Sequence, residues 1–171
     1  ASLPQQRQDF IISESKCLFV VTDAILSGEK EKEEKQRRSK VTIAGNCTAY
    51  VIFTSGSTGM PKGTPISHGS LMTFCHNACH VTGIDSHSRM LQYANKGFDA
   101  SIYELFPVLT VRGTLVFPTE EDKHDLSRLM DFIEQERISE AVIPPSLMSV
   151  LPYRVIPTLK TIVLGGETTP K

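Results

Sequence analysis

The stretch TAYVIFTSGSTGMPKG, residues 48–63, joins a run of apolar residues to a loop rich in glycine and hydroxyl side chains. β-Branched and aromatic residues predominate in residues 48–54, which predicts a strand. In the loop, glycines let backbone N–H groups approach an oxyanion closely, serine and threonine add small donors, and Lys62 adds a mobile positive charge. This combination predicts a loop that binds a polyphosphate.

The spacing of the loop differs from that of the P-loop, G-x-x-x-x-G-K-[ST]. Gly59 stands three residues before Lys62, and Gly63 occupies the place of the Mg²⁺-binding hydroxyl residue. Pro61 also disfavours a direct passage from the loop into a helix. A flexible Gly/Ser linker without a binding role is the alternative. A strong strand next to the loop, and the lysine and proline within it, argue against such a linker.

The rest of the chain alternates between strand-like and helix-like patterns. The expected strands are 17–22, 89–94, 113–118, 140–145 and 159–166, and the expected helices are 67–80, 99–110 and 122–137. In the last helix Leu126, Leu129, Met130 and Ile133 form one apolar stripe, whereas Pro107 predicts a kink or an early end in the helix at 99–110. The alternation predicts an α/β fold, a largely parallel sheet flanked by helices.

Three polar segments lie at or shortly after the ends of expected strands: the glycine-rich loop, Asp99, and Gly165 to Glu167. Ligands of parallel sheets bind at the carboxyl ends of the strands. We therefore expect these segments to line one edge of the sheet together.

Composition excludes several classes of protein. The chain has 171 residues, enough for one domain, and a net charge of -1, which argues against a general nucleic-acid binder. It contains no apolar run of membrane-spanning length and no signal peptide, so we expect a cytoplasmic protein with no membrane partner and with free cysteines. The charged segment 27–40 has no apolar face, which predicts a solvated surface insertion; a partner-docking patch is the alternative.

The segment CHNACH, residues 75–80, contains two pairs that could bind zinc. Cys75 and Cys79 stand four residues apart, as do His76 and His80. On one helix the two pairs point about 100° apart, so all four cannot easily meet one ion. The pattern favours a partly buried helix face, and we expect no metal there.

The segment YVIFTSGSTGMPKG (50–63) resembles the phosphate-binding signature of adenylate-forming enzymes, which include nonribosomal peptide synthetase adenylation domains, acyl-CoA synthetases and luciferases. FDAS (98–101), followed by IYELF, resembles the amino-acid branch, as do residues 113–139 and 159–167 in order and spacing. Phe53 stands where the family often has tyrosine. The resemblance covers essentially the whole chain outside the charged insertion. It implies part of the large N-terminal subdomain of an adenylate-forming enzyme.

The resemblance implies ATP binding, with the loop closing over the phosphates and Mg²⁺ bridging phosphate oxygens. It gives Lys62 a catalytic role, in which the ammonium group holds the β and γ phosphates as pyrophosphate leaves. The implied nucleotide-binding residues are Thr54, Ser55, Gly56, Ser57, Thr58, Gly59, Lys62, Gly63, Gly165, Gly166 and Glu167.

The resemblance also implies an amino-acid pocket in which Asp99 pairs with the α-ammonium group of the substrate. From the residues alone, the pattern favours Asp99 as a helix N-cap, and Val142 and Val163 would be core strand residues in almost any fold. The implied pocket residues are Phe98, Asp99, Ala100, Tyr103, Val142, Val163 and Gly165. Apart from Asp99 this set carries no charge, so we expect an uncharged, mostly apolar amino acid of moderate size.

The function implied is the ATP-dependent formation of an aminoacyl adenylate, followed by loading onto the thiol of a peptidyl carrier protein within a multidomain synthetase. One alternative is an acyl- or aryl-acid CoA ligase, against which Asp99 weighs; another is a non-catalytic nucleotide-binding or docking fragment. The family's adenine and ribose contacts and its small mobile C-terminal subdomain would follow Lys171. We therefore expect residues 1–171 to be part of an adenylation domain, inactive and marginally stable in isolation.

Overall fold

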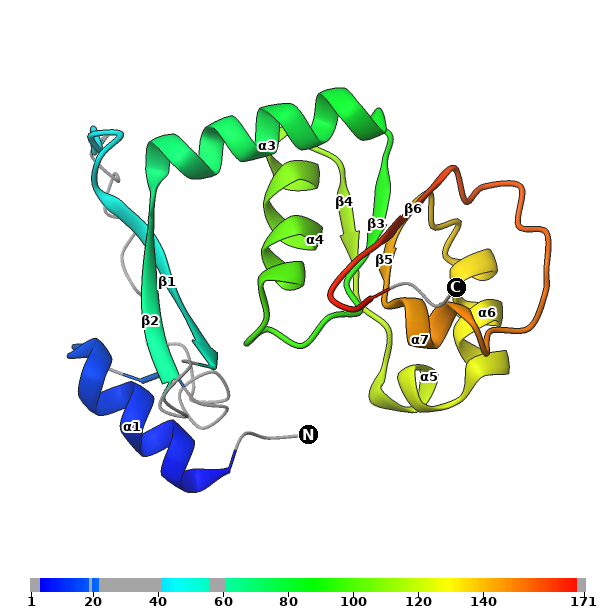
Figure 1. The fold of residues 1–171 in the computed structure, drawn as a ribbon. Helices are drawn as coiled ribbons and strands as arrows, with labels where there is room; N and C mark the ends of the chain where they lie inside the picture. Colours follow the sequence, from blue (N-terminus) through cyan, green and yellow to red (C-terminus); the bar gives the residue numbers. More distant parts are fainter. Residues whose placement is uncertain (1–3, 19, 22–40, 56–60, 169–171) are drawn as a thin grey trace, which may run out of the picture. The chain divides into compact units, whose positions relative to one another are not determined.

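The computed structural model describes residues 4–18, 20–21, 41–55 and 61–168, and these fall into two compact units that meet in sequence at Gly69 and Ser70 (Figure 1). The charged insertion at 27–40 and residues 56–60 of the glycine-rich loop lie outside the described residues.

The first unit contains the helix α1 (Gln5–Ser15) and two antiparallel strands, β1 (Thr48–Ser55) and β2 (Pro61–Ser67). β1 confirms the strand expected at 48–54. β2 was not predicted, because its sequence PKGTPIS contains two prolines and a glycine, which weaken strands. It forms by pairing with β1, and a two-stranded ribbon tolerates proline because each strand has a free edge.

The strand expected at 17–22 is wrong for the residues of that segment that the structure describes. Cys17, Leu18, Val20 and Val21 form no strand, and all four are exposed, Leu18 at 95%. An apolar run becomes a strand only when a neighbouring strand accepts its hydrogen bonds. The described strands of this unit, β1 and β2, pair with each other instead.

The second unit is built on a parallel sheet of four strands in the order β4-β3-β5-β6. The strands are β3 (Arg89–Leu91), β4 (Thr114–Val116), β5 (Glu140–Ile143) and β6 (Thr161–Leu164). The helices are α3 (His68–Thr82), which begins at the last residues of the first unit, α4 (Asp99–Thr110), α5 (Glu120–His124), α6 (Leu126–Gln135) and α7 (Pro145–Met148). The predicted α/β fold with a parallel sheet is confirmed.

Helices cover both faces of this sheet (Figure 1). On β3, Leu91 belongs to the apolar cluster that α6 completes with Leu129 and Ile133, whereas Met90 belongs to the cluster with Val108 of α4. Successive strand residues point to opposite faces, so a sheet covered on both sides buries adjacent apolar residues. This explains why the strands read as continuous apolar runs.

The single helix expected at 122–137 is wrong, because the chain breaks at Asp125. This residue has extended backbone angles, and its carboxylate accepts the N–H groups of Ser127 (2.9 Å) and Arg128 (3.1 Å) as the N-cap of α6. A side-chain acceptor that satisfies the free N–H groups of a new helix makes the break favourable. The predicted apolar stripe is correct from Leu129 onward.

Pro107 does not end α4 early, since the helix continues to Thr110. The Thr110 hydroxyl donates to the Pro107 carbonyl at 2.7 Å, and the Cys79 thiol donates to the same oxygen at 3.5 Å. These bonds satisfy a carbonyl near the end of the helix. Among the described helices, none combines the length and the apolar character needed to cross a membrane.

Candidate functional site

A cavity of about 340 Å³ lies in the second unit, at the carboxyl ends of β3, β5 and β6. It brings together seven residues that the sequence predicts for the substrate or nucleotide site: Phe98, Asp99, Ala100, Val142, Gly165, Gly166 and Glu167. The expectation that Asp99 and the segment 165–167 share one edge of the sheet is therefore met by the geometry.

Tyr103 and Val163, the other two predicted pocket residues, line a second and smaller cavity. This cavity leaves no room for a water molecule, and Glu140 contributes an acidic side chain to its lining. The structure thus divides the predicted pocket residues between a cavity that has room for a ligand and one that is too small for a water molecule.

Asp99 is the first residue of α4, and Phe98 holds the N-cap position without a side-chain cap. The alternative role of Asp99 as the helix N-cap is therefore not seen. The Asp99 side chain is exposed, and none of the described residues pairs with its carboxylate in a hydrogen bond or ion pair. A carboxylate in the first turn is favoured by the helix dipole and remains available to a cationic ligand.

A tight turn leads the chain from β3 into α4. The Asn95 side-chain oxygen accepts the Gly97 N–H at 2.9 Å, and the Asn95 carbonyl accepts the Phe98 N–H at 3.0 Å. The Ser101 hydroxyl then donates to the Phe98 carbonyl at 2.6 Å. These bonds fix the backbone on both sides of Asp99.

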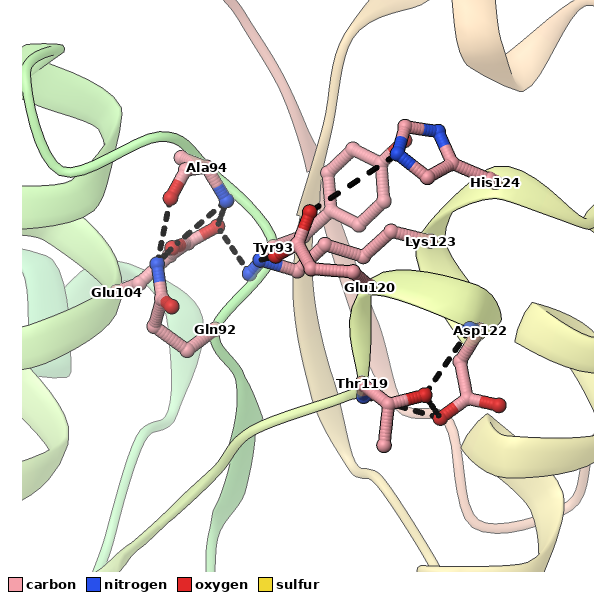
Figure 2. Close-up of polar contacts among 9 residues, drawn as sticks. All are labelled: Gln92, Tyr93, Ala94, Glu104, Thr119, Glu120, Asp122, Lys123 and His124. Atoms are coloured by element: carbon pink, nitrogen blue, oxygen red, sulfur yellow. Dashed lines mark hydrogen bonds and ion pairs between the residues drawn. The ribbon is translucent and has the colours of Figure 1, made fainter. Parts of the chain in front are cut away.

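Sequence reasoning missed four further lining residues, Tyr93, Ala94, Asn95 and Pro144, and the buried carboxylate behind them. Glu104 of α4 accepts hydrogen bonds from Gln92, Tyr93 and Ala94 (Figure 2). Burial raises the pKa of Glu104, while these donors and the charge of Lys123 act to lower it. The available signal was an acidic residue within the apolar run IYELF.

Glu167 is tied to the segment that follows β5. Its carboxylate accepts the Ser146 N–H at 3.2 Å. Gly166 has a φ of 87°, a backbone conformation that favours glycine. A Cβ added at Gly165 or Gly166 would meet no atom within 4 Å, so the backbone here faces open space that a ligand can approach.

The AMP-binding enzyme family model matches residues 2–171. The chain belongs to the AMP-binding enzyme family. It is 47% identical over 125 residues, 73% of the chain, to nonribosomal peptide synthetase 8 of Aspergillus fumigatus (strain ATCC MYA-4609 / CBS 101355 / FGSC A1100 / Af293). It is 40% identical over 154 residues, 88% of the chain, to malformin synthetase mlfA of Aspergillus vadensis (strain CBS 113365 / IMI 142717 / IBT 24658). The chain spans 1% and 3% of the length of these two relatives.

Solved structures agree with this family. The nonribosomal peptide synthetase FmoA3 in its AMPPNP-bound form has a TM-score of 0.69 at 23% identity over 82% of this chain and 16% of its own. Its alpha-methyl-L-serine-AMP-bound form has a TM-score of 0.65 at 25% identity over 74% and 15%. The N-terminal subdomain of Klebsiella oxytoca NpsA, in complex with 3-hydroxyanthranilyl-AMSN, has a TM-score of 0.76 at 19% identity over 98% and 46%. The resemblance to synthetase adenylation domains is thus confirmed.

In this AMP-binding enzyme, β1 and β2 bracket the predicted phosphate loop. Thr54 pairs with Lys62, and Ser55 pairs with Pro61 across the hairpin. The loop residues Gly56, Ser57, Thr58 and Gly59 lie outside the described residues. Roles for Thr54, Ser55, Lys62 and Gly63 in phosphate binding stay predictions.

Among the described residues of this AMP-binding enzyme, no three His, Cys, Asp or Glu side chains are placed to hold a metal ion. On α3, Cys75 is buried and Cys79 half-buried, whereas His76 and His80 are exposed. Burial raises the pKa of both thiols, which disfavours the thiolate form that binds metals. The two cysteines contribute to the buried face of the helix.

Proposed function

We propose that this chain activates an uncharged, mostly apolar α-amino acid as its aminoacyl adenylate. The observation that carries the proposal is the Asp99 carboxylate, which has no partner among the described residues and lines an otherwise mainly apolar cavity at the carboxyl ends of the parallel strands. An ammonium group that leaves water requires an opposite charge and an acceptor, and Asp99 offers both. Ala100 and Val142 line the same cavity and suit an apolar side chain.

The reaction joins the two substrates without a covalent enzyme intermediate. A carboxylate oxygen of the amino acid attacks the α-phosphorus of ATP, a new P–O bond forms, and the bond to the β-phosphate breaks to release pyrophosphate. Positioning and charge stabilisation dominate such a transfer. Asp99 holds the ammonium group, and the open backbone at Gly165 and Gly166 gives the nucleotide a close approach.

Lys62 and the glycine-rich loop are the proposed phosphate-binding groups. The complexes of FmoA3 with AMPPNP and with alpha-methyl-L-serine-AMP support the use of a nucleotide by this fold. Mg²⁺ would neutralise phosphate charge when bound, but no described residue is assigned to it, because the described part of the chain has no cluster of metal-binding side chains.

Loading of the activated amino acid onto a carrier-protein thiol completes the proposal, with neighbouring synthetase domains as partners. Support comes from the peptide synthetases among the relatives, which include a linear gramicidin synthase of Brevibacillus parabrevis at 30% identity over 178 residues, 96% of this chain and 2% of that protein. A cytoplasmic location stays a prediction.

An aryl-acid ligase is the second candidate function. The NpsA subdomain, which binds a 3-hydroxyanthranilyl compound, has a fold similar to that of this chain. A carboxylic acid without an α-ammonium group would gain nothing from Asp99, so this residue distinguishes the two candidates.

The test is ATP–pyrophosphate exchange with a panel of amino acids and aryl acids, measured on the full-length gene product. Asp99→Ala should lower kcat/KM for the preferred amino acid by about 10- to 150-fold, since a hydrogen bond to a charged group contributes about 1.5–3 kcal/mol. Asp131→Ala, another exposed aspartate on a helix of the same unit, is the control and should leave kcat/KM unchanged. Exchange that depends on aryl acids and is unaffected by the Asp99 change would establish the second candidate instead.

A further inference from the structure

The Glu104 carboxylate on α4 is completely buried, with 0% of the residue exposed. Oε1 accepts the N–H groups of Tyr93 at 3.2 Å and Ala94 at 2.9 Å. Oε2 accepts the Ala94 N–H at 3.1 Å and the Gln92 side-chain amide at 3.1 Å (Figure 2). A buried carboxylate is costly unless donors compensate it, and every hydrogen bond that Glu104 accepts from the described residues comes from one short segment after β3.

This segment forms a wall of the cavity. Tyr93 and Ala94 both line the cavity, and they follow directly after the last strand position, Leu91, and Gln92. Their N–H groups bind Glu104 and leave the strand ladder, which explains why β3 ends before the predicted position 94. The Gln92 amide also donates to the Ala94 carbonyl at 2.6 Å and closes the network.

Glu104 connects this wall to the element that carries the ammonium-binding group. α4 begins at Asp99, so Glu104 lies on the same helix, five residues further along. The carboxylate therefore sets the distance between the Tyr93–Ala94 wall and the start of α4. A shift of either one would change the shape of the cavity around a bound ligand.

A second buried carboxylate provides the comparison. Glu140 is the first residue of β5 and is 3% exposed. It accepts the Ser88 hydroxyl at 3.4 Å, and Ser88 directly precedes β3. Glu140 thus lies at the amino ends of the strands, whereas the cavity that Asp99 lines lies at their carboxyl ends. If a buried carboxylate contributed only to the stability of the fold, its replacement would have similar effects on substrate binding at both sites.

We propose that Glu104 is a positioning residue that holds the Tyr93–Ala94 wall in register with Asp99 and thereby determines the affinity of the cavity for the carboxylic acid that is activated. The inference rests on the proposed function for the identity of that acid as an amino acid. It does not require Glu104 to touch the substrate, because the carboxylate acts through the backbone that it binds.

The test compares Glu104→Gln with Glu140→Gln in the full-length gene product. Glutamine keeps the shape of the side chain but turns one acceptor oxygen into a donor, which then faces N–H donors. Glu104→Gln should raise KM for the amino acid about tenfold, with smaller changes in kcat and in KM for ATP, since a displaced cavity wall weakens binding of the amino acid and a tenfold change corresponds to about 1.4 kcal/mol of binding free energy. Glu140→Gln should leave KM for the amino acid unchanged, because the cavity that Glu140 lines is too small even for a water molecule and cannot admit the substrate.

A second measurement does not depend on activity. Hydrogen–deuterium exchange followed by mass spectrometry should show faster exchange of peptides that cover residues 93–99 in Glu104→Gln and unchanged exchange there in Glu140→Gln. A milder variant, Gln92→Leu, keeps the backbone donors and removes one side-chain donor, so KM should rise by a smaller factor. If Glu104→Gln does not fold, Gln92→Leu takes its place in both measurements.

Equal effects of the two glutamine variants on KM, or unchanged exchange at 93–99 in Glu104→Gln, would overturn the inference. If the wild-type protein activates only acids without an α-ammonium group, the proposed function fails. In that case the role of Glu104 is decided by the effect of Glu104→Gln on KM for that acid and on hydrogen–deuterium exchange at residues 93–99. The two failures are therefore distinguishable.

Discussion

In the unit that ends at Gly69, none of the described residues is buried, whereas the unit from Ser70 holds both apolar clusters. Val41, Ile43 and Val51 of the first unit are exposed. A two-stranded hairpin has no interior of its own, but a parallel sheet with helices on both faces encloses one on each side. The phosphate-loop signature and the apolar core thus lie in different parts of the chain, so a strong functional motif is no guide to where stability resides.

The largest expected difference between the units concerns apolar packing. Leu129→Ala should lower the free energy of unfolding by about 2–5 kcal/mol, because this α6 side chain is 0% exposed and its truncation leaves a cavity. Val51→Ala on β1, where the side chain is 47% exposed, should change it by less than about 0.5 kcal/mol. Urea unfolding followed by circular dichroism measures both. Equal losses would show that the hairpin also buries apolar surface.

A smaller difference concerns glycines at close contacts. A Cβ at Gly113 would lie 2.6 Å from Val108 Cγ2 and 3.0 Å from the carbonyl oxygens of Asp85 and Ser88, so Gly113→Ala should cost about 1–3 kcal/mol. A Cβ at Gly63 on β2 would meet the Phe53 ring at 3.0 Å, and this half-exposed ring can move aside. Thermal melts should therefore show a clear decrease in Tm for Gly113→Ala and a smaller one for Gly63→Ala. The opposite order would contradict the comparison.

The smallest expected effect is a pH dependence of the free energy of unfolding that arises from a buried carboxyl group of the second unit. Burial raises the pKa of Glu140 above its ordinary value of 4.5. The stability that this carboxyl contributes is therefore fully present below pH 4.5 and is lost as the pH rises through the folded-state pKa. Glu140→Gln should accordingly gain stability relative to wild type as the pH rises from about 4 to 7.

A carboxyl with the opposite shift gives the control for this experiment. Hydrogen bonds from Thr119 hold the pKa of Asp122 below its ordinary value of 3.8, so its contribution is present above that pH and is lost as the pH falls through the folded-state pKa. Asp122→Asn should therefore be less stable than wild type near neutral pH, and its free energy of unfolding should approach that of wild type in acid. Parallel unfolding curves for wild type and Glu140→Gln at every pH would mean that Glu140 is hydrated.

Local sequence patterns predicted the elements that depend on near neighbours. β1, α3 and α4 lie at the predicted positions, because β-branched runs and apolar periodicity report the preference of each segment directly. The break at Asp125 was missed, since the apolar stripe begins only at Leu126 and does not show where the helix starts, and only the N-cap hydrogen bonds make two helices favourable. The strand expected at 17–22 was wrong at the exposed Leu18, because an apolar run does not reveal whether a neighbouring strand pairs with it.

The sequence alone determined the family and the parallel α/β class, because these are properties of short, continuous segments; the roles of the phosphate loop and Asp99 stay predictions. Only the tertiary structure decided that Asp99 shares a cavity with residues 165–167, that Tyr103 lines a different one, and that Glu104 binds the end of β3. Such contacts join segments whose distance depends on where strands end and helices begin. A pattern within one segment carries no information about the atom that a side chain meets on another.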